Sequence, residues 1–213
     1  MKRLLLGALM LPSLLVAQRA SAQFHVGAGL NIPKYGSVGM QPSIQARAGV
    51  DFLERKYTIA AGFNFSPTSI KETDDIPYYD ASGASKNYSL VTKYNFNNFF
   101  VHAYRNFGDQ ENRFRFSLLT GISWDMVSIK NSIEGTAPAT APSYQASESL
   151  TTIKLDFGVA GNYQMGDNGM LFAELMTGLR ANQANGQYIS NPGVSHYGLT
   201  LGYKYYFGGL NNY

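Results

Sequence analysis

The sequence predicts an all-β chain folded as an eight-stranded antiparallel up-and-down transmembrane β-barrel. Apolar and polar side chains alternate with period two along eight segments, so each segment has a bulky face and a small or polar face. The connections between these segments alternate between long and short, as they do in barrels that cross a membrane. The composition of 15 tyrosines, 13 phenylalanines and 22 glycines favours strands over helices.

The first 22 residues have the features of a secretory leader. Lys2 and Arg3 precede an apolar run over residues 4–17, and Ala20-Ser21-Ala22 supplies small residues at a cleavage site. We expect residues 1–22 to be a cleaved signal peptide and residues 23–213 to form one barrel domain. Removing Lys2, Arg3 and Arg19 leaves 14 of the 17 basic residues against 14 acidic ones, so a nucleic-acid partner is not expected. The absence of cysteine excludes a disulfide scaffold and a thiol enzyme.

The strands follow from the alternation in chain order. They are expected over residues 24–32, 43–53, 57–66, 88–107, 113–126, 151–163, 170–180 and 195–207. Long loops are expected over residues 33–42, 67–87, 128–149 and 181–193, and short turns over residues 54–56, 108–112 and 166–169. The last strand shows the pattern most fully, with Tyr197, Leu199, Leu201, Tyr203, Tyr205 and Phe207 on one face.

The fourth segment is ambiguous because its apolar alternation changes phase near Asn97-Asn98. Tyr94 and Phe96 follow one phase, whereas Phe99 and Val101 follow the other. We favour one strand with a bulge at this point. The alternative is a hairpin turn there, which would make nine strands. Single-chain bacterial barrels have even strand numbers, and this favours eight.

The strand phases predict a network of charged side chains inside the barrel. Its expected members are Arg47, Asp51, Arg115, Asp125, Lys154, Asp156, Glu174, Arg180 and Lys204. Glu174 and Lys204 lie on neighbouring strands and are expected to form an ion pair. An eight-stranded barrel is about wide enough for side chains to fill, so an open diffusion pore is not expected.

No catalytic, cofactor or metal site is expected. His25, His102 and His196 are predicted to face inward, whereas a lipid-directed hydrolase would need its catalytic residues near the outer rim and facing the lipid. Three scattered histidines match no metal-ligand spacing. The acidic residues Asp74, Asp75 and Asp80 lack an ordered calcium-loop motif and fit a solvated loop better.

The terminal segment carries the most specific motif. Residues 200–207 read Thr-Leu-Gly-Tyr-Lys-Tyr-Tyr-Phe, a polar-x-Gly-x-x-aromatic-x-aromatic pattern formed by Thr200, Gly202, Tyr205 and Phe207. With the leader and the alternation, the mature chain resembles the small outer-membrane β-barrel proteins of Gram-negative bacteria, of the Bacteroidota PorT-like or OmpX/OmpA-like kind. The resemblance implies that these four residues are read by the barrel-assembly machinery. Such signals commonly end the chain, whereas residues 208–213 follow here.

The alternation of long loops and short turns predicts a bacterial outer-membrane location, and because the first strand follows the leader, both mature termini are expected in the periplasm. Outer-membrane lipids and lipopolysaccharide would then be partners, together with a possible outer-membrane protein partner. We expect a non-enzymatic protein with an envelope or interaction role through the outer loops at residues 67–87 and 128–149. An accessory subunit of an outer-membrane secretion or transport complex is one alternative, and a narrow ion or solute channel is another.

Overall fold

The computed structural model describes residues 22–35, 39–108, 112–135, 147–181, 195–208 and 210 as an antiparallel β-barrel. Its strands are β1 (Gln23–Tyr35), β2 (Gly39–Met40), β3 (Ser43–Phe52), β4 (Tyr57–Phe65), β5 (Ile70–Tyr79), β6 (Ser85–Phe107), β7 (Phe114–Glu134), β8 (Ser147–Met165), β9 (Gly169–Arg180) and β10 (Ser195–Tyr206). All of the predicted leader except Ala22 lies outside these ranges, and its cleavage stays a prediction.

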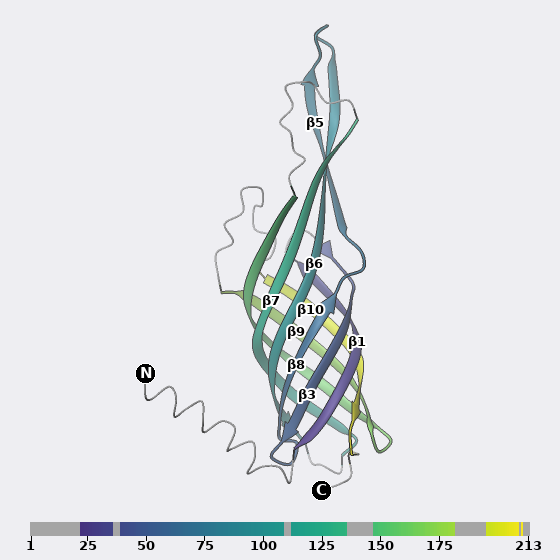
Figure 1. Ribbon diagram of the computed structural model, residues 1–213, viewed down its shortest axis with the longest axis vertical. Helices are drawn as coiled ribbons and strands as arrows, with labels where there is room; N and C mark the ends of the chain where they lie inside the picture. The colour runs from purple at the N-terminus through teal and green to yellow at the C-terminus, as the bar shows by residue number, and fades with distance from the viewer. Residues whose placement is uncertain are drawn as a thin grey trace, which may run out of the picture.

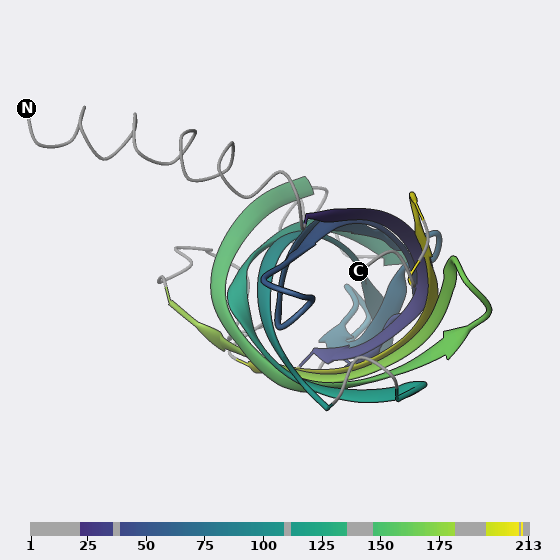
Figure 2. The same ribbon diagram turned by 90° about the horizontal axis from the view of Figure 1, so that it is seen from below.

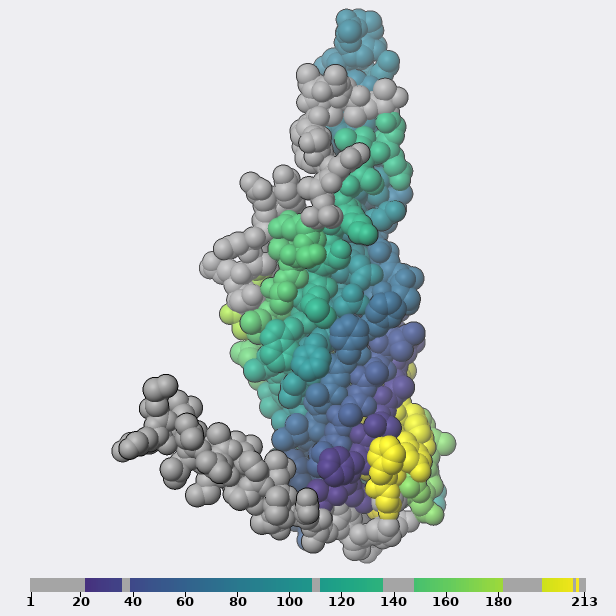
Figure 3. All heavy atoms as spheres, in the orientation of Figure 1, coloured from purple at the N-terminus to yellow at the C-terminus, as the bar shows by residue number. Residues whose placement is uncertain are grey.

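Eight strands close a ring in the order β1, β3, β4, β6, β7, β8, β9 and β10. The first and last strands pair antiparallel from His25 opposite Tyr206 to Tyr35 opposite His196, which removes both sheet edges. Figure 2 shows the ring end-on, and Figure 3 shows the first described strand (purple) beside the last one (yellow) on its wall. The predicted eight-stranded up-and-down barrel is confirmed.

The two faces of the wall are the reverse of those in a water-soluble protein. On β4, the side chains of Ile59, Phe63 and Phe65 are exposed, whereas Thr58 and Asn64 are buried. The other ring strands repeat this arrangement, with large apolar side chains outside and many polar ones inside. An apolar outer face and a polar interior are what a barrel needs in lipid.

Strand β6 has no bulge, so that part of the prediction is wrong. Its register with β7 continues without interruption through Asn97 opposite Met126 and Asn98 opposite Asp125. The phase of the sequence changes because the aromatic side chains change face. Phe96 is buried in the lumen, whereas Phe99 is exposed on the outer wall. The prediction of one strand over residues 88–107 is right, and that strand is longer than expected.

Strands occupy most of one predicted loop and part of another. Residues 67–87 contain β5 and the start of β6, which form a hairpin from Ile70 opposite Tyr94 to Tyr79 opposite Ser85. Within residues 128–149, β7 continues to Glu134 and β8 begins at Ser147. We call β5, residues 85–94 of β6 and residues 129–134 of β7 the arm. Figure 1 shows it rising far above the ring; β5, β6 and β7 pair at its base, and β5 and β6 alone form its tip.

The arm continues the wall because β4 and β5 run along the same edge of β6, separated by residues 66–69. The side chain of Gln41 fills this interruption. Its Oε1 accepts a hydrogen bond from the Phe96 amide at 2.9 Å, and its Nε2 donates to the carbonyl of Thr68. Gln41 therefore replaces the ladder contact that the broken strand cannot make.

Both ends of the described ring lie at the side of the short turns. Gln23, the first residue of β1, is opposite Asp51, beside the turn at residues 53–56. At the other end of the chain, the Tyr206 amide donates to the carbonyl of Asn168 in the turn between β8 and β9. No helix in the described part of the chain is long and apolar enough to cross a membrane.

The tail after β10 folds back under the ring as far as the structure describes it. Leu210 is buried against Met170 and Tyr206, and its amide donates to the carbonyl of Asp167. Arg55, from the turn between β3 and β4, donates to the carbonyl of Leu210 at 3.0 Å. Gly208 has a φ of 94°, a value that favours glycine, where the chain turns inward.

The tip of the arm should loosen in acid. Asp80 accepts hydrogen bonds from the amides of Ser82 at 2.8 Å and Ala84 at 3.1 Å, and from Lys86 Nζ at 2.8 Å. These bonds, that from Lys86 foremost, lower the pKa of Asp80 to about 2. Because the folded pKa lies below the unfolded one, this stabilisation is complete above about pH 4 and is lost as the pH falls towards 2.

The check is the NMR shift of the Ala84 amide between pH 6 and 2, with Asp80→Asn as the control. In the native protein, we expect the Ala84 amide shift to change at the acidic end of this pH range. In Asp80→Asn, the shift should stay constant over the whole range. Equal titration in both would mean that another acid governs the tip.

Candidate functional site

The candidate site is the polar interior of the ring. The structure places the predicted charged residues on inward-facing positions of five strands. Eight of them are buried and one, Arg180, is partly exposed; the eight are Arg47, Asp51, Arg115, Asp125, Lys154, Asp156, Glu174 and Lys204. Charges this confined need partners and hydrogen bonds, so their pairing decides what the lumen can do.

The centre of the lumen is an ion pair between Arg47 of β3 and Glu174 of β9. Arg47 Nη1 lies 2.6 Å from Glu174 Oε1. Tyr104 of β6 donates its hydroxyl to the same Oε1 at 3.0 Å and also accepts from Arg47. The guanidinium carbon lies 4.8 Å from the ring centroid of Phe172 and 5.8 Å from that of Phe100. Three strands that are not neighbours in the ring, β3, β6 and β9, are thus joined across the lumen.

The predicted ion pair between Glu174 and Lys204 is wrong. The register of β9 with β10 sets Thr200 opposite Glu174 and Met170 opposite Lys204, so the two charges are four positions apart along the wall. Lys204 Nζ instead donates to Asn162 Oδ1 at 3.0 Å. Glu174 reaches across the lumen to Arg47, a contact that neighbour-strand reasoning could not find.

Two further charge clusters lie closer to the arm. Lys154 of β8 bonds to Asp125 of β7, and Asn98 donates to the same carboxylate at 2.7 Å. His102 Nε2 lies 3.0 Å from Asp156 Oδ2. The histidine and asparagine partners were missed, although Asn64, Asn98 and Asn162 occupy inward positions in the alternation and could have signalled a polar ladder.

The last cluster lies near the short turns. Asp51 accepts hydrogen bonds from Thr58 Oγ1 at 2.7 Å and from the Tyr206 hydroxyl at 3.1 Å, and His25 Nδ1 lies 3.6 Å away. Arg115 and Lys204 line a polar cavity beside Asp51 with a volume of about 10 Å³. Such a volume holds about one water molecule.

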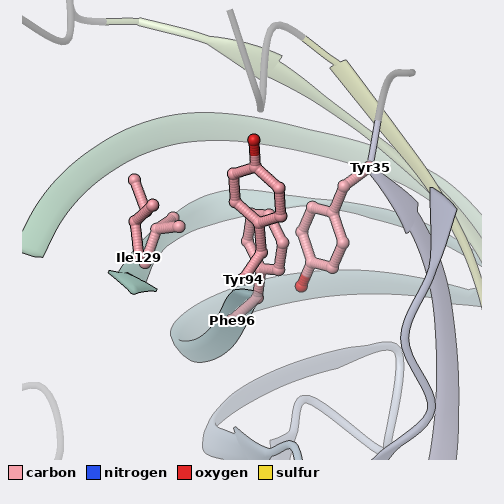
Figure 4. Packing of buried hydrophobic residues seen from close by; sticks show 5 residues of the cluster. Tyr35, Tyr94, Phe96 and Ile129 are labelled. Atoms are coloured by element: carbon pink, nitrogen blue, oxygen red, sulfur yellow. The ribbon is translucent and has the colours of Figure 1, made fainter. Parts of the chain in front are cut away.

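The lumen is closed at both ends by apolar side chains. At the arm side, Tyr35, Tyr94, Phe96, Val127 and Ile129 form what we call the mouth cluster. Figure 4 shows its rings meeting across the lumen; those of Tyr35 and Phe96 stack with centroids 3.9 Å apart. At the other side, Met170, Tyr206 and Leu210 form a smaller base cluster. The described lumen is therefore a filled plug of ion pairs between two apolar closures.

The described side chains form no hydrolase triad. His102 resembles the middle member, since Nε2 faces Asp156, but its buried Nδ1 has no hydrogen-bond partner and so no nucleophile. His25 is also buried and faces Asp51. The side chain of His196 lies outside the described residues. Over those same residues, no three histidine or acidic side chains gather into a metal site.

The four residues of the predicted assembly motif divide between the two faces. Thr200 is buried and donates to Asn31 Oδ1 at 3.0 Å, and Gly202 packs closely against the Ala28 carbonyl. Tyr205 and Phe207 are exposed on the outer wall, with their rings edge to face at 5.5 Å. Two of the four residues thus contribute to closing the ring, and two remain available on its surface.

Aromatic side chains mark two levels on the outer wall. Phe99 and Trp124 form one pair on β6 and β7, with ring centroids 5.5 Å apart. Phe107 and Phe116 form another pair at the short-turn end of the same strands, and the exposed Phe114 at the start of β7 marks the lower limit of this level. Trp124 and Phe114 are ten positions apart on β7. At ~3.4 Å per residue and a tilt of ~40°, this separates the levels by roughly 26 Å, close to the height of an outer-membrane apolar band.

The closed ring, the filled polar lumen and the banded apolar exterior define a small transmembrane β-barrel. No protein-family profile matches the sequence, and no curated protein matches it. Among solved structures, a major outer membrane protein from Thermus thermophilus is similar, with 14% identity over 88% of this chain and 100% of that chain and a TM-score of 0.58. Neisserial surface protein A is also similar, with 14% identity over 87% of this chain and 99% of that chain and a TM-score of 0.51. At these identities the likeness establishes the barrel fold.

Proposed function

We propose that the protein lies in the bacterial outer membrane, with both mature termini in the periplasm, and has a non-enzymatic envelope role. The arm supports this proposal most directly, because it extends the wall beyond the apolar band as an ordered sheet. The short turns and both ends of the ring lie at the opposite side. Long outer segments with short periplasmic turns are the arrangement of outer-membrane barrels, and this sets the orientation we propose.

The arm has features of a protein-binding element. Tyr79 near its tip is 79% exposed, and Tyr78 packs beside Tyr88 with ring centroids 6.0 Å apart. Ile76 and Leu90 lie on the same face as Tyr78 and Tyr88. Tyrosine is enriched at protein interfaces because it combines a large contact area with a hydroxyl. We therefore place the partner contact at this end of the arm, and the partner is another envelope protein or an outer-membrane complex.

A conducting role receives less support. Ions would have to pass the mouth cluster, the Arg47–Glu174 pair and the base cluster, all of which are packed in the described structure. The narrower PorT-like grouping has no support beyond the sequence resemblance.

The test is to shorten the arm while keeping the ring. Lys71 and Lys93 are directly opposite each other, so residues 72–92 can be replaced by Asn-Gly, the preferred two-residue hairpin turn. We expect the shortened barrel to insert normally, as judged by heat-modifiable electrophoretic mobility. The partner that forms an adduct with a photocrosslinking residue at position 79 of the full arm in intact cells should no longer co-purify with the shortened barrel.

A photocrosslinker at Tyr203 is the matched control, since this side chain is exposed on the lipid-facing wall. An adduct with another outer-membrane protein from position 79 alone would favour the accessory-subunit role. Adducts from neither position, or a partner that co-purifies equally with the shortened barrel, would contradict the interaction role.

A further inference from the structure

A row of three lysines crosses the base of the arm. Lys71 of β5 is directly opposite Lys93 of β6, which is directly opposite Lys130 of β7. All three side chains are exposed. Like charges that face one another across neighbouring strands destabilise a sheet, so this row is unfavourable unless something neutralises it.

Internal neutralisation is incomplete. Glu134 lies 3.2 Å from Lys71 Nζ and balances one of the three charges. Within the described ranges, no carboxylate lies within ion-pair distance of Lys93 or Lys130. The row therefore keeps an excess of about two positive charges on an open face.

The row faces outward, on the same side of the wall as the upper aromatic level. From Lys93, alternate residues down β6 are Asn95, Asn97 and Phe99, of which Phe99 is exposed. From Lys130, alternate residues down β7 are Ser128, Met126 and Trp124. Along the outer face of both strands, a lysine is followed by polar side chains and then by the apolar band. This order matches the headgroup, interface and hydrocarbon layers of a membrane.

The height of the row fits the headgroup region. Lys130 is four positions beyond Met126, the last large apolar side chain on that face of β7. At ~3.4 Å per residue and ~40° tilt, the lysines lie roughly 10 Å above it. The polar layer on each side of the hydrocarbon is about 5–8 Å thick, and long lysine side chains can reach back into it from this height.

We propose that Lys71, Lys93 and Lys130 bind the phosphate groups of an outer-leaflet glycolipid. Each ammonium group offers three donors and no acceptor, which suits phosphate oxygens. Neighbouring strands are ~4.8 Å apart, so the row spans about 10 Å and can contact more than one phosphate of the same headgroup. The site rests on the proposed outer-membrane location, and it would anchor the base of the arm to the surrounding leaflet.

The test is a titration of the full-length mature barrel in neutral phosphatidylcholine nanodiscs with phosphorylated lipid A, read by native mass spectrometry. Lys93→Gln and Lys130→Gln should each weaken binding about fivefold and together about 25-fold, at about 1 kcal/mol per lysine near an anionic surface. Lys86→Gln is the matched control. It removes the same charge from the same strand at the arm tip, where Lys86 pairs with Asp80.

Several outcomes would overturn the site. Equal weakening by Lys86→Gln would show that only net charge matters, and equal binding of phosphate-free lipid A would remove the phosphate from the recognition. Free pyrophosphate that binds as tightly as lipid A would replace the glycolipid by a soluble anion. Failure of the wild-type chain to enter neutral nanodiscs would contradict the proposed location, whereas insertion without lipid A binding would contradict the lysine site alone.

A stability measurement separates ligand binding from a structural role. Without any phosphorylated ligand, Lys93→Gln should leave the arm as resistant to protease as the wild type, or more so, because it removes a like-charge contact. An arm that is cleaved faster in Lys93→Gln would mean that the lysine is needed for folding, and the proposal would fail.

Discussion

Glu174→Leu should destabilise the folded barrel by about 3–5 kcal/mol, because it leaves the buried Arg47 without its carboxylate. The double variant Arg47→Met with Glu174→Leu should recover most of this loss. It replaces two buried charges by apolar side chains that can pack against Phe100 and Phe172. Equilibrium urea unfolding in lipid vesicles measures both effects, and Trp124, the one tryptophan of the chain, is a suitable fluorescent reporter on the outer wall.

The matched control is Glu134→Leu, which breaks the exposed pair with Lys71. Exposed pairs contribute about 0–1 kcal/mol, so this variant should unfold almost like the wild type. Equal losses for Glu174→Leu and Glu134→Leu would mean that the lumen is hydrated enough to tolerate an isolated charge. A double variant as unstable as Glu174→Leu would mean that the centre requires polar side chains.

Gly62→Ala and Gly202→Ala should each impair refolding from urea into lipid vesicles and cost about 1–3 kcal/mol by overpacking. A Cβ atom at position 62 would lie 2.6 Å from the Ala46 carbonyl oxygen, and one at position 202 would lie 2.5 Å from Phe172 Cζ. At position 202 the Cβ atom would also clash with the Ala28 carbonyl oxygen. In both cases the obstacle is the backbone of a neighbouring strand, which cannot move away without breaking the hydrogen bonds between the strands. Gly161→Ala is the control, since its nearest neighbour would be the Phe114 ring at 3.4 Å, and it should refold normally.

This comparison also tests the assembly motif. Gly62 lies outside the motif and Gly202 within it, yet both meet the same kind of steric limit. Equal defects in vesicles, with a larger defect of Gly202→Ala in cells, would support recognition of the motif by the assembly machinery. Equal defects in both settings would assign Gly202 to packing alone.

The period-two pattern predicted the ring well because each lipid-facing position must be apolar, whatever its neighbours are. The same rule failed on β6, where Tyr94 and Phe96 fill the mouth of the lumen instead of facing lipid. It failed again on β5, where Glu72 and Asp74 interrupt the apolar face of a strand that stands in water. Alternation identifies strands in lipid, and it becomes ambiguous where both faces can be aromatic or both can be polar.

The sequence could predict which charged residues lie in the lumen, but not which of them form ion pairs with each other. Inward positions follow from parity alone, so the charged residues could be assigned to the lumen one strand at a time. The contact of Arg47 with Glu174 depends on how the tilted strands close the ring, and no single strand encodes that geometry. For the same reason, the pairing of His102 with Asp156 and the closure of the mouth by Tyr35 and Phe96 could only be seen in the folded chain.

The docking of Leu210 depends on the closure of the ring. Its partners come from the turn between β3 and β4, from the turn between β8 and β9, and from β10 itself. These segments surround one binding position only after the first and last strands have paired. The tail can therefore dock only on a closed ring. Its docking stabilises the closed barrel and none of the open folding intermediates.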